Sequence, residues 1–152
     1  MTTILLSIHP RHAINIMMGN KRWEFRRNLP FLNLKDPLST IIFYATKPWG
    51  QVVCQANVEL HLCYPFDELQ ALWYAVENEN PGITEEEFYR YFKGCKQAYA
   101  VKLCNVVVLY QPEFPHYGLR LSDFGVKCAP QNFCYLPEKV NKEVNSNAKC
   151  CL

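Results

Sequence analysis

Two apolar runs separated by one tight turn constrain the fold of this 152-residue chain most strongly. LSTIIFYAT at residues 38–46 and VVCQANVEL at residues 52–60 have the length and the β-branched content of strands. The KPWG segment between them is turn-prone, because proline and glycine favour the backbone angles of turns. We therefore expect a hairpin here, with a sheet built around it.

Shorter apolar runs and three stretches of helical periodicity surround this hairpin. Apolar residues at helical spacing and favourable end residues, such as the capping-box pattern of Thr84 and Glu87, mark the helices. The turn-prone pair Cys104-Asn105 separates two of the strands. The pattern predicts further strands at 4–9, 22–26, 98–103, 106–110 and 133–136, and helices at 11–18, 66–77 and 84–93.

The order of these elements determines the expected fold class. Strands and helices do not alternate strictly, so a doubly wound parallel sheet is not expected. We predict an α+β fold, a small mixed β-barrel with helices inserted around it. Residues 1–136 form this domain, and the polar, charged residues 137–152 form a flexible tail.

The composition excludes several classes of protein. Hydrophobic residues make up 49% of the chain, which excludes global disorder. No window approaches the roughly 18 apolar residues of a membrane helix, and the N-terminal MTTILLSIHPRH lacks the basic start and cleavage site of a signal peptide. We expect a cytoplasmic protein with no membrane partner. Its eight cysteines, which include no CxxC pair, are then reduced thiols, not disulfides or zinc ligands.

The sequence contains none of the short motifs that announce a cofactor or a well-known hydrolase. A P-loop, a dinucleotide-binding glycine fingerprint, HExxH and GxSxG are all absent, so no cofactor and no metal are expected. His9 and His12 lie three residues apart across Pro10 with no evident third ligand. We interpret them as capping or solvated residues.

Charge is distributed unevenly along the chain. Residues 1–35 carry six Lys/Arg against one acid, and residues 91–152 carry eight against four. Residues 59–90, which span the two middle helices, carry eight acids against one arginine. Basic ends that meet in the fold would attract phosphate, whereas the acidic 59–90 segment would suit a basic protein partner.

The segment GNKRWEFRR at residues 19–27 has the alternation of a strand. Trp23 and Phe25 share one face, which we assign to the core, and Arg22, Glu24 and Arg26 share the other. A carboxylate between two guanidinium groups is neutralised locally and still leaves donors for a phosphate or a nucleobase edge. A solvated sheet edge is the alternative interpretation.

Four successive segments resemble the signatures of an ASCH domain, a family of the PUA-like superfamily. They are LLSIHPRHAINIMMGNKRWEFRR, IIFYATKPWGQVV, FKGCKQAYAVKL and APQNFCYL, and together they span about residues 3–136. The central family motif, a glycine-x-lysine followed by a glutamate and an arginine, stands here as Gly19-x-Lys21-x-x-Glu24-x-Arg26.

The resemblance implies a β-barrel-like fold with a basic cleft that binds RNA or nucleotides. By this analogy the ligand is single-stranded RNA or a modified nucleoside, held by cations and stacked on aromatic rings. The residues predicted to bind it are Lys21, Arg22, Arg26, Arg27, Thr46, Lys47, Pro48, Trp49, Tyr99, Gln131 and Phe133.

Enzymes among the relatives give the alternative function, hydrolysis. The chain resembles small bacterial N4-acetylcytidine amidohydrolases, whose lysine matches Lys21 and whose glutamate loosely matches Glu79. Their threonine falls on Glu24, so the expected hydroxyl is missing there, and Thr46 is a candidate to replace it in space. Other relatives are ribonucleases. If the protein is a hydrolase of either kind, Lys21 and Glu24 are the predicted catalytic residues.

Overall fold

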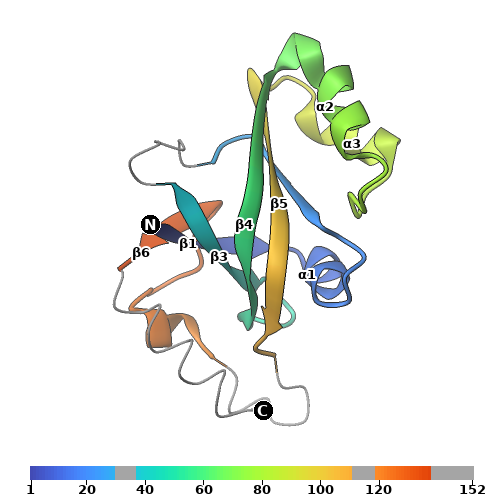
Figure 1. The fold of residues 1–152 in the computed structure, drawn as a ribbon. Coiled ribbons are helices and arrows are strands. Elements are labelled where there is room, and N and C mark those ends of the chain that lie inside the picture. Colours follow the sequence, from blue (N-terminus) through green and yellow to red (C-terminus); the bar gives the residue numbers. More distant parts are fainter. Residues whose placement is uncertain (30–36, 111–118, 138–152) are drawn as a thin grey trace.

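The structure, a computed structural model, describes residues 1–29, 37–110 and 119–137. Its centre is one mixed six-stranded sheet with the strand order β2-β5-β4-β3-β1-β6 (Figure 1). Strands β1 and β3 are parallel, and the other neighbouring pairs are antiparallel. The strands are β1 (Thr2–Ile8), β2 (Trp23–Arg26), β3 (Leu38–Ala45), β4 (Gln51–Pro65), β5 (Gln97–Val108) and β6 (Phe133–Leu136).

Three α-helices and two short 3-10 helices complete the described chain. They are α1 (Pro10–Met17), η1 (Phe66–Glu68), α2 (Leu69–Val76), α3 (Glu85–Phe92) and η2 (Leu121–Phe124). Helix α1 begins at a proline, which suits the first helical turn, and His9 caps it by accepting a hydrogen bond from the Arg11 N–H. Helix α3 has the capping box predicted from Thr84 and Glu87.

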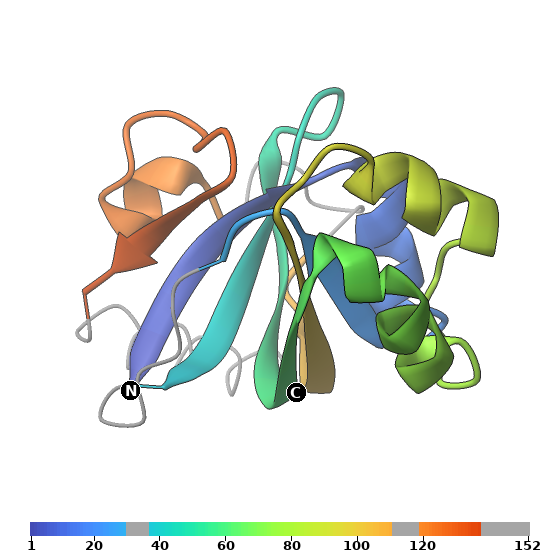
Figure 2. The same cartoon turned by 90° about the horizontal axis from the view of Figure 1, so that it is seen from above.

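Both faces of the sheet are covered. On one face the largest core cluster joins strands β1, β3, β4 and β5 to α1, through residues such as Ile4, Phe43 and Ile16. On the other face, α2 and α3 pack over β2 and β5, where the Phe25 and Phe88 rings meet edge to face at 5.4 Å. Figure 2 shows α2 and α3 grouped at one end of the sheet, with η2 and β6 at the opposite end.

The predicted α+β fold with a mixed sheet is confirmed, although the sheet does not close and is a barrel only loosely. One predicted detail is wrong. Strand β5 runs without interruption through Cys104 and Asn105, where we expected a turn. Asn105 has a positive φ of 49°, and the pairing of β5 with β4 shifts register between Gln55 and Asn57, so a bulge replaces the turn.

The other predicted elements agree with the structure to within a few residues, except that β4 continues to Pro65 where we expected it to end at Leu60. No helix in the described part of the chain is long and apolar enough to cross a membrane. The six cysteines in the described ranges are free, and Cys150 and Cys151 lie outside them. The predicted tail also lies outside them, from residue 138 onward, so the domain boundary stays a prediction.

Candidate functional site

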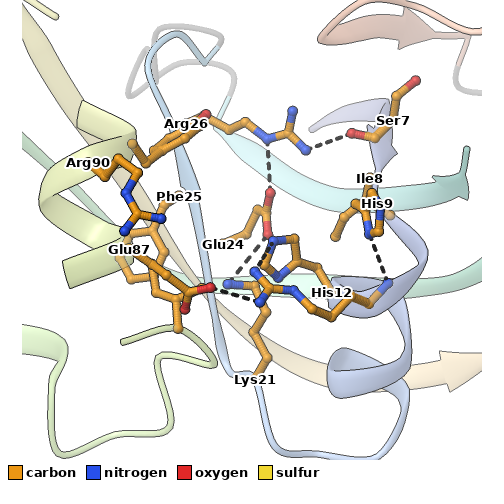
Figure 3. Close-up of a pocket in the computed structure, with 13 residues that line it drawn as sticks. Ser7, Ile8, His9, His12, Lys21, Glu24, Phe25, Arg26, Glu87 and Arg90 are labelled. Carbon is orange, nitrogen blue, oxygen red and sulfur yellow. Dashed lines mark hydrogen bonds and ion pairs between the residues drawn. The ribbon is translucent and has the colours of Figure 1, made fainter. Parts of the chain in front are cut away.

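A cavity of about 400 Å³ lies where the end of β1, the start of α1, strand β2 and helix α3 meet (Figure 3). The segment from Ser7 to His12 forms one wall and the segment from Ile83 to Tyr91 forms the facing wall. Lys21, Glu24 and Arg26 lie between the two walls. The charged residues of the family motif therefore converge on one hollow.

Lys21 is only 2% exposed, which is rare for an ammonium group. Its Nζ donates to the Pro81 carbonyl at 3.1 Å and lies 5.0 Å from the centre of the Phe25 ring. The stem of the side chain packs against Gly82, where an added Cβ would lie 2.4 Å from the Lys21 Cβ. Burial lowers the pKa of Lys21 most; nearby Arg26 also lowers it, and Glu24 opposes both.

Glu24 links Lys21 to Arg26. Its carboxylate is buried, with Oε1 accepting a hydrogen bond from the Arg26 Nε at 2.9 Å and Oε2 lying 3.9 Å from the Lys21 Nζ. The expected alternation is correct, because Trp23 and Phe25 pack under α2 and α3. The opposite face of β2 is also covered, so the alternative of a solvated edge does not hold for Lys21 and Glu24.

Arg26 joins two strands that share no backbone pairing. Its Nη2 donates to the Ser7 carbonyl of β1 at 2.6 Å, and its Nη1 donates to the Asn132 Oδ1 at 3.1 Å. Asn132 in turn donates from Nδ2 to the Asn28 carbonyl at 2.7 Å. The guanidinium therefore holds Glu24 in place and bridges the open side of the sheet between β2 and β1.

The opposite part of the cavity is held by an ion pair between two helices. Arg11 of α1 donates from Nη1 to Glu87 Oε1 of α3 at 2.7 Å. Hydrogen bonds from the Thr84 backbone and from Arg11 lower the pKa of Glu87 to about 2. His12 lines the same region, and burial, with a smaller effect of Lys21, lowers its pKa to about 4. His12 is therefore neutral at pH 7.

Several predicted binding residues lie elsewhere. Arg22 points away from the cavity, with Nη2 3.9 Å from Glu59 Oε2. Arg27 donates from Nε to the Tyr91 carbonyl at 2.6 Å and lies over the Tyr91 ring. Tyr99 is buried in the sheet core.

The hairpin and the C-terminal strand also lie outside the cavity lining. Of the predicted residues there, Thr46, Lys47, Pro48, Trp49, Gln131 and Phe133 are not among the residues that line it. Thr46 comes nearest in the hydrogen-bond network, because its N–H donates to the carbonyl of the lining residue Ile8 at 3.0 Å. Gln131 is exposed, and Phe133 packs against the core. Glu79 pairs with Lys102 at 2.8 Å, away from Lys21.

Sequence reasoning missed other residues that line the cavity or hold its lining in place. Arg11, Glu87 and Asn132 each act through a partner far along the chain, so no local spacing reveals them. Among the sequence patterns, only the capping box of Thr84 and Glu87 indicated that a hydrogen bond holds the Glu87 side chain at the start of α3. Within the described residues no group of three or more His, Cys, Asp or Glu side chains is arranged to hold a metal ion.

This arrangement offers a polar ligand both donors and acceptors inside a half-open hollow. Lys21 supplies an ammonium, Glu24 a carboxylate and His12 a neutral ring, beside the aromatic surfaces of Phe25 and Tyr91. Such a mixture matches a planar group with its own polar edge better than it matches an aliphatic ligand.

Comparison with solved structures identifies the fold. The chain matches the crystal structure of ASCH from Zymomonas mobilis with a TM-score of 0.74 and 22% identity, covering 95% of this chain and 94% of that chain. The protein has the ASCH fold. Two variants of the Zymomonas protein, one with a serine replaced by alanine and one with a tyrosine replaced by phenylalanine, also match with TM-scores of 0.74. Their identities are 23% and 22%, and they cover 95% of this chain and 95% and 96% of their own.

No protein-family model matches the sequence, and no curated protein matches it. At this level of identity the ASCH fold is what the likeness establishes. The ligand and any reaction must be argued from the cavity itself.

Proposed function

We propose that the cavity binds an unpaired nucleobase, presented by single-stranded RNA or by a modified nucleoside. The ASCH fold supports this proposal, because the PUA-like superfamily that it resembles is associated with RNA. The cavity volume of about 400 Å³ is in the range of small-molecule sites. Tyr91, which is exposed, provides a ring surface against which a base can pack, whereas Phe25 is largely buried beneath Lys21.

The observation that carries the proposal is the buried pair of Lys21 and Glu24. Both side chains are at most 6% exposed and yet lie 3.9 Å apart, longer than a direct hydrogen bond. Burying charges is costly. Arg26 pairs with Glu24 and the Pro81 carbonyl accepts from Lys21, but the two buried charges stay apart beside a cavity, which favours a role in ligand binding. A donor beside an acceptor matches the polar edge of a nucleobase.

Binding of nucleosides and of a short single-stranded RNA to Glu24→Gln tests this function. The substitution preserves the shape of the side chain but removes the charge that Lys21 and Arg26 share. We expect the affinity to fall at least tenfold, measured by calorimetry, since hydrogen bonds to charged groups contribute about 1.5–3 kcal/mol.

Arg22→Gln is the matched control, because Arg22 lies two residues away, just before β2, but points toward Glu59. If the folded Glu24→Gln protein binds these ligands as tightly as the wild type does, the cavity is not the binding site.

Hydrolysis is the second candidate, and the lowered pKa of Lys21 favours it. Burial makes the Lys21 amine easier to deprotonate, so it can act as a general base, and the Glu24 carboxylate lies 3.9 Å from it as a second acid-base group. The reaction would be deacylation of a nucleoside such as N4-acetylcytidine, or cleavage of RNA. Thr46, the proposed replacement for the missing hydroxyl, does not line the cavity, so water would be the nucleophile in a deacylation.

Mass spectrometry of N4-acetylcytidine incubated with the protein separates the two candidates. A hydrolase releases cytidine and acetate, and Lys21→Met abolishes the release. If the nucleoside binds but no product forms, even at equal concentrations of protein and nucleoside, hydrolysis is excluded and the binding function remains.

A further inference from the structure

A second hollow, of about 660 Å³, lies beside the β3–β4 hairpin and shares no lining residue with the cavity described above. One side comes from the hairpin and its flanking strands, and the other side comes from the segment that contains η2. The residues that bear on the argument are Tyr44, Trp49, Gln51, Arg120, Ser122 and Lys127.

Trp49 gives this hollow a fixed aromatic surface. Its ring stacks on Tyr110 with a centroid distance of 4.6 Å and an interplanar angle of 11°. Trp49 lines the hollow, whereas Tyr110 does not, and packing against the core keeps Trp49 partly buried. Gln51 beside it has a buried side-chain oxygen with no hydrogen-bond partner. A ring held in place and an unused acceptor together suit a nucleobase.

The charges of this hollow differ from those of the cavity. Arg120 and Lys127 are exposed, and neither forms an ion pair with another residue of the described ranges. The nearest acid in sequence, Asp123, accepts a hydrogen bond from the Arg120 backbone N–H at 2.7 Å. In the cavity, by contrast, Arg11 and Arg26 are both paired with carboxylates. The positive charge available to a phosphate is therefore at the second hollow.

The hairpin connects the two hollows. The N–H of Thr46 donates to the carbonyl of Ile8, a cavity residue, at 3.0 Å. The N–H of Trp49 donates to the carbonyl of Thr46 at 3.2 Å. Two successive backbone hydrogen bonds thus lead from the wall of one hollow to the aromatic surface of the other.

We propose that the second hollow is a nucleotide subsite, occupied by the same single-stranded RNA whose base enters the cavity. Another base of the same strand stacks on Trp49, and Arg120 and Lys127 contact backbone phosphates. The inference rests on the proposed function of the cavity. It names single-stranded RNA, not a free nucleoside, as the ligand, and it gives a role to Trp49, which the cavity leaves unused.

Fluorescence anisotropy with a labelled single-stranded octanucleotide, and calorimetry with cytidine, test the subsite. The variant is Arg120→Gln combined with Lys127→Gln. The matched control is Lys93→Gln combined with Lys96→Gln, two exposed lysines that line neither hollow. We expect the variant to bind the octanucleotide about tenfold more weakly than the control does. The slope of log affinity against log salt should fall by about 1.4, because each single-strand phosphate contact contributes about 0.7.

Cytidine binding should be unchanged in the Arg120/Lys127 variant and lost in Glu24→Gln. Trp49→Leu should weaken octanucleotide binding at least tenfold, with thermal melting to check that the variant is folded. Octanucleotide binding by the Arg120/Lys127 variant that equals the control would overturn the subsite and leave the cavity function intact. If the wild-type protein binds neither cytidine nor the octanucleotide, both proposals are overturned.

Discussion

The Lys21 side chain is enclosed by a loop sixty residues away in the sequence. The Asn80 carbonyl accepts a hydrogen bond from the Arg22 backbone N–H, and the Pro81 carbonyl accepts one from the Lys21 ammonium. Gly82 lies against the aliphatic part of the Lys21 side chain. Gly82 also has a φ of +73°, in the region that glycine adopts most readily. At the scale of single residues, the cavity thus depends on a glycine that carries no chemistry of its own.

Gly82→Ala tests this dependence. The new Cβ would lie 2.4 Å from two carbons of Lys21, so Lys21 or the loop must move. We expect the free energy of unfolding to fall by about 2–4 kcal/mol, from overpacking and from the strained backbone. Chemical denaturation measures the loss, and ligand affinity should fall with it.

Gly94→Ala provides the control, because Gly94 has a similar φ of +78° but no atom within 4 Å of the added Cβ. It should show only the backbone cost. If both variants lose the same free energy of unfolding, Lys21 moves aside for the new Cβ at no energetic cost.

At the scale of elements, α1 and α3 are held together across the cavity by Arg11 and Glu87. Glu87 also closes the capping box of α3, so one carboxylate serves the start of one helix and the link to another. The cavity width depends on this contact, because the two helices form its facing walls.

Glu87→Gln tests the contact through its pH dependence. The folded-state pKa of Glu87 is about 2, below the usual 4.5, so its charge stabilises the fold above about pH 4.5. This stabilisation is lost as the pH falls toward 2. We expect the variant to be less stable by about 1 kcal/mol at pH 7, a discounted value for a partly exposed ion pair. Urea denaturation at several pH values should show the difference vanishing near pH 2.

Glu86→Gln is the control, since Glu86 is 81% exposed and pairs with Arg90 on the same helix. A gap between Glu87→Gln and wild type that persists unchanged at pH 2 would contradict the assigned cause.

At the scale of the whole molecule, side-chain hydrogen bonds connect the two ends of a sheet whose strands do not close into a barrel. The sheet ends at β2 on one side and at β6 on the other, and Arg26 and Asn132 connect β2 to the strands at the far end. Asn132 lies 106 residues from Arg26. The same two residues fix the position of Glu24, so the stability of the domain and the geometry of the cavity are linked.

Asn132→Ala should therefore lower both stability and affinity. The variant loses a hydrogen bond to a charged group and one to the Asn28 carbonyl, which together predict a loss of about 1–3 kcal/mol. Denaturation and nucleoside calorimetry measure the two effects. The neighbouring Gln131→Ala is the control, because Gln131 is exposed, and it should change neither quantity. A loss of stability with unchanged affinity would show that Glu24 keeps its position without this support.

The sequence predicted what depends on neighbours along the chain and failed where the partner is distant. The alternation at Trp23 and Phe25 correctly assigned the core face, and the capping pattern located the start of α3. Alternation gives the face of Arg22 and Arg26 but not their partners, so it could not distinguish the solvated Arg22 from the enclosed Arg26.

The same limit explains the choice of Gln131 and Phe133 over Asn132, the residue between them that contacts Arg26. The turn expected at Cys104-Asn105 failed for a related reason. Asn105 does take the positive φ that the turn would need, but pairing with β4 keeps the strand continuous on both sides of it.

The open sheet has a consequence for how the protein meets copies of itself. Exposed strand edges are templates for pairing with another chain. The edge at β2 is four residues long, and Arg26 at its end is hydrogen-bonded to the Ser7 carbonyl of β1. Among the described residues the other edge is β6, only four residues long. A short edge offers few backbone hydrogen bonds to a neighbour, so the fold resists edge-to-edge aggregation without needing a closed barrel.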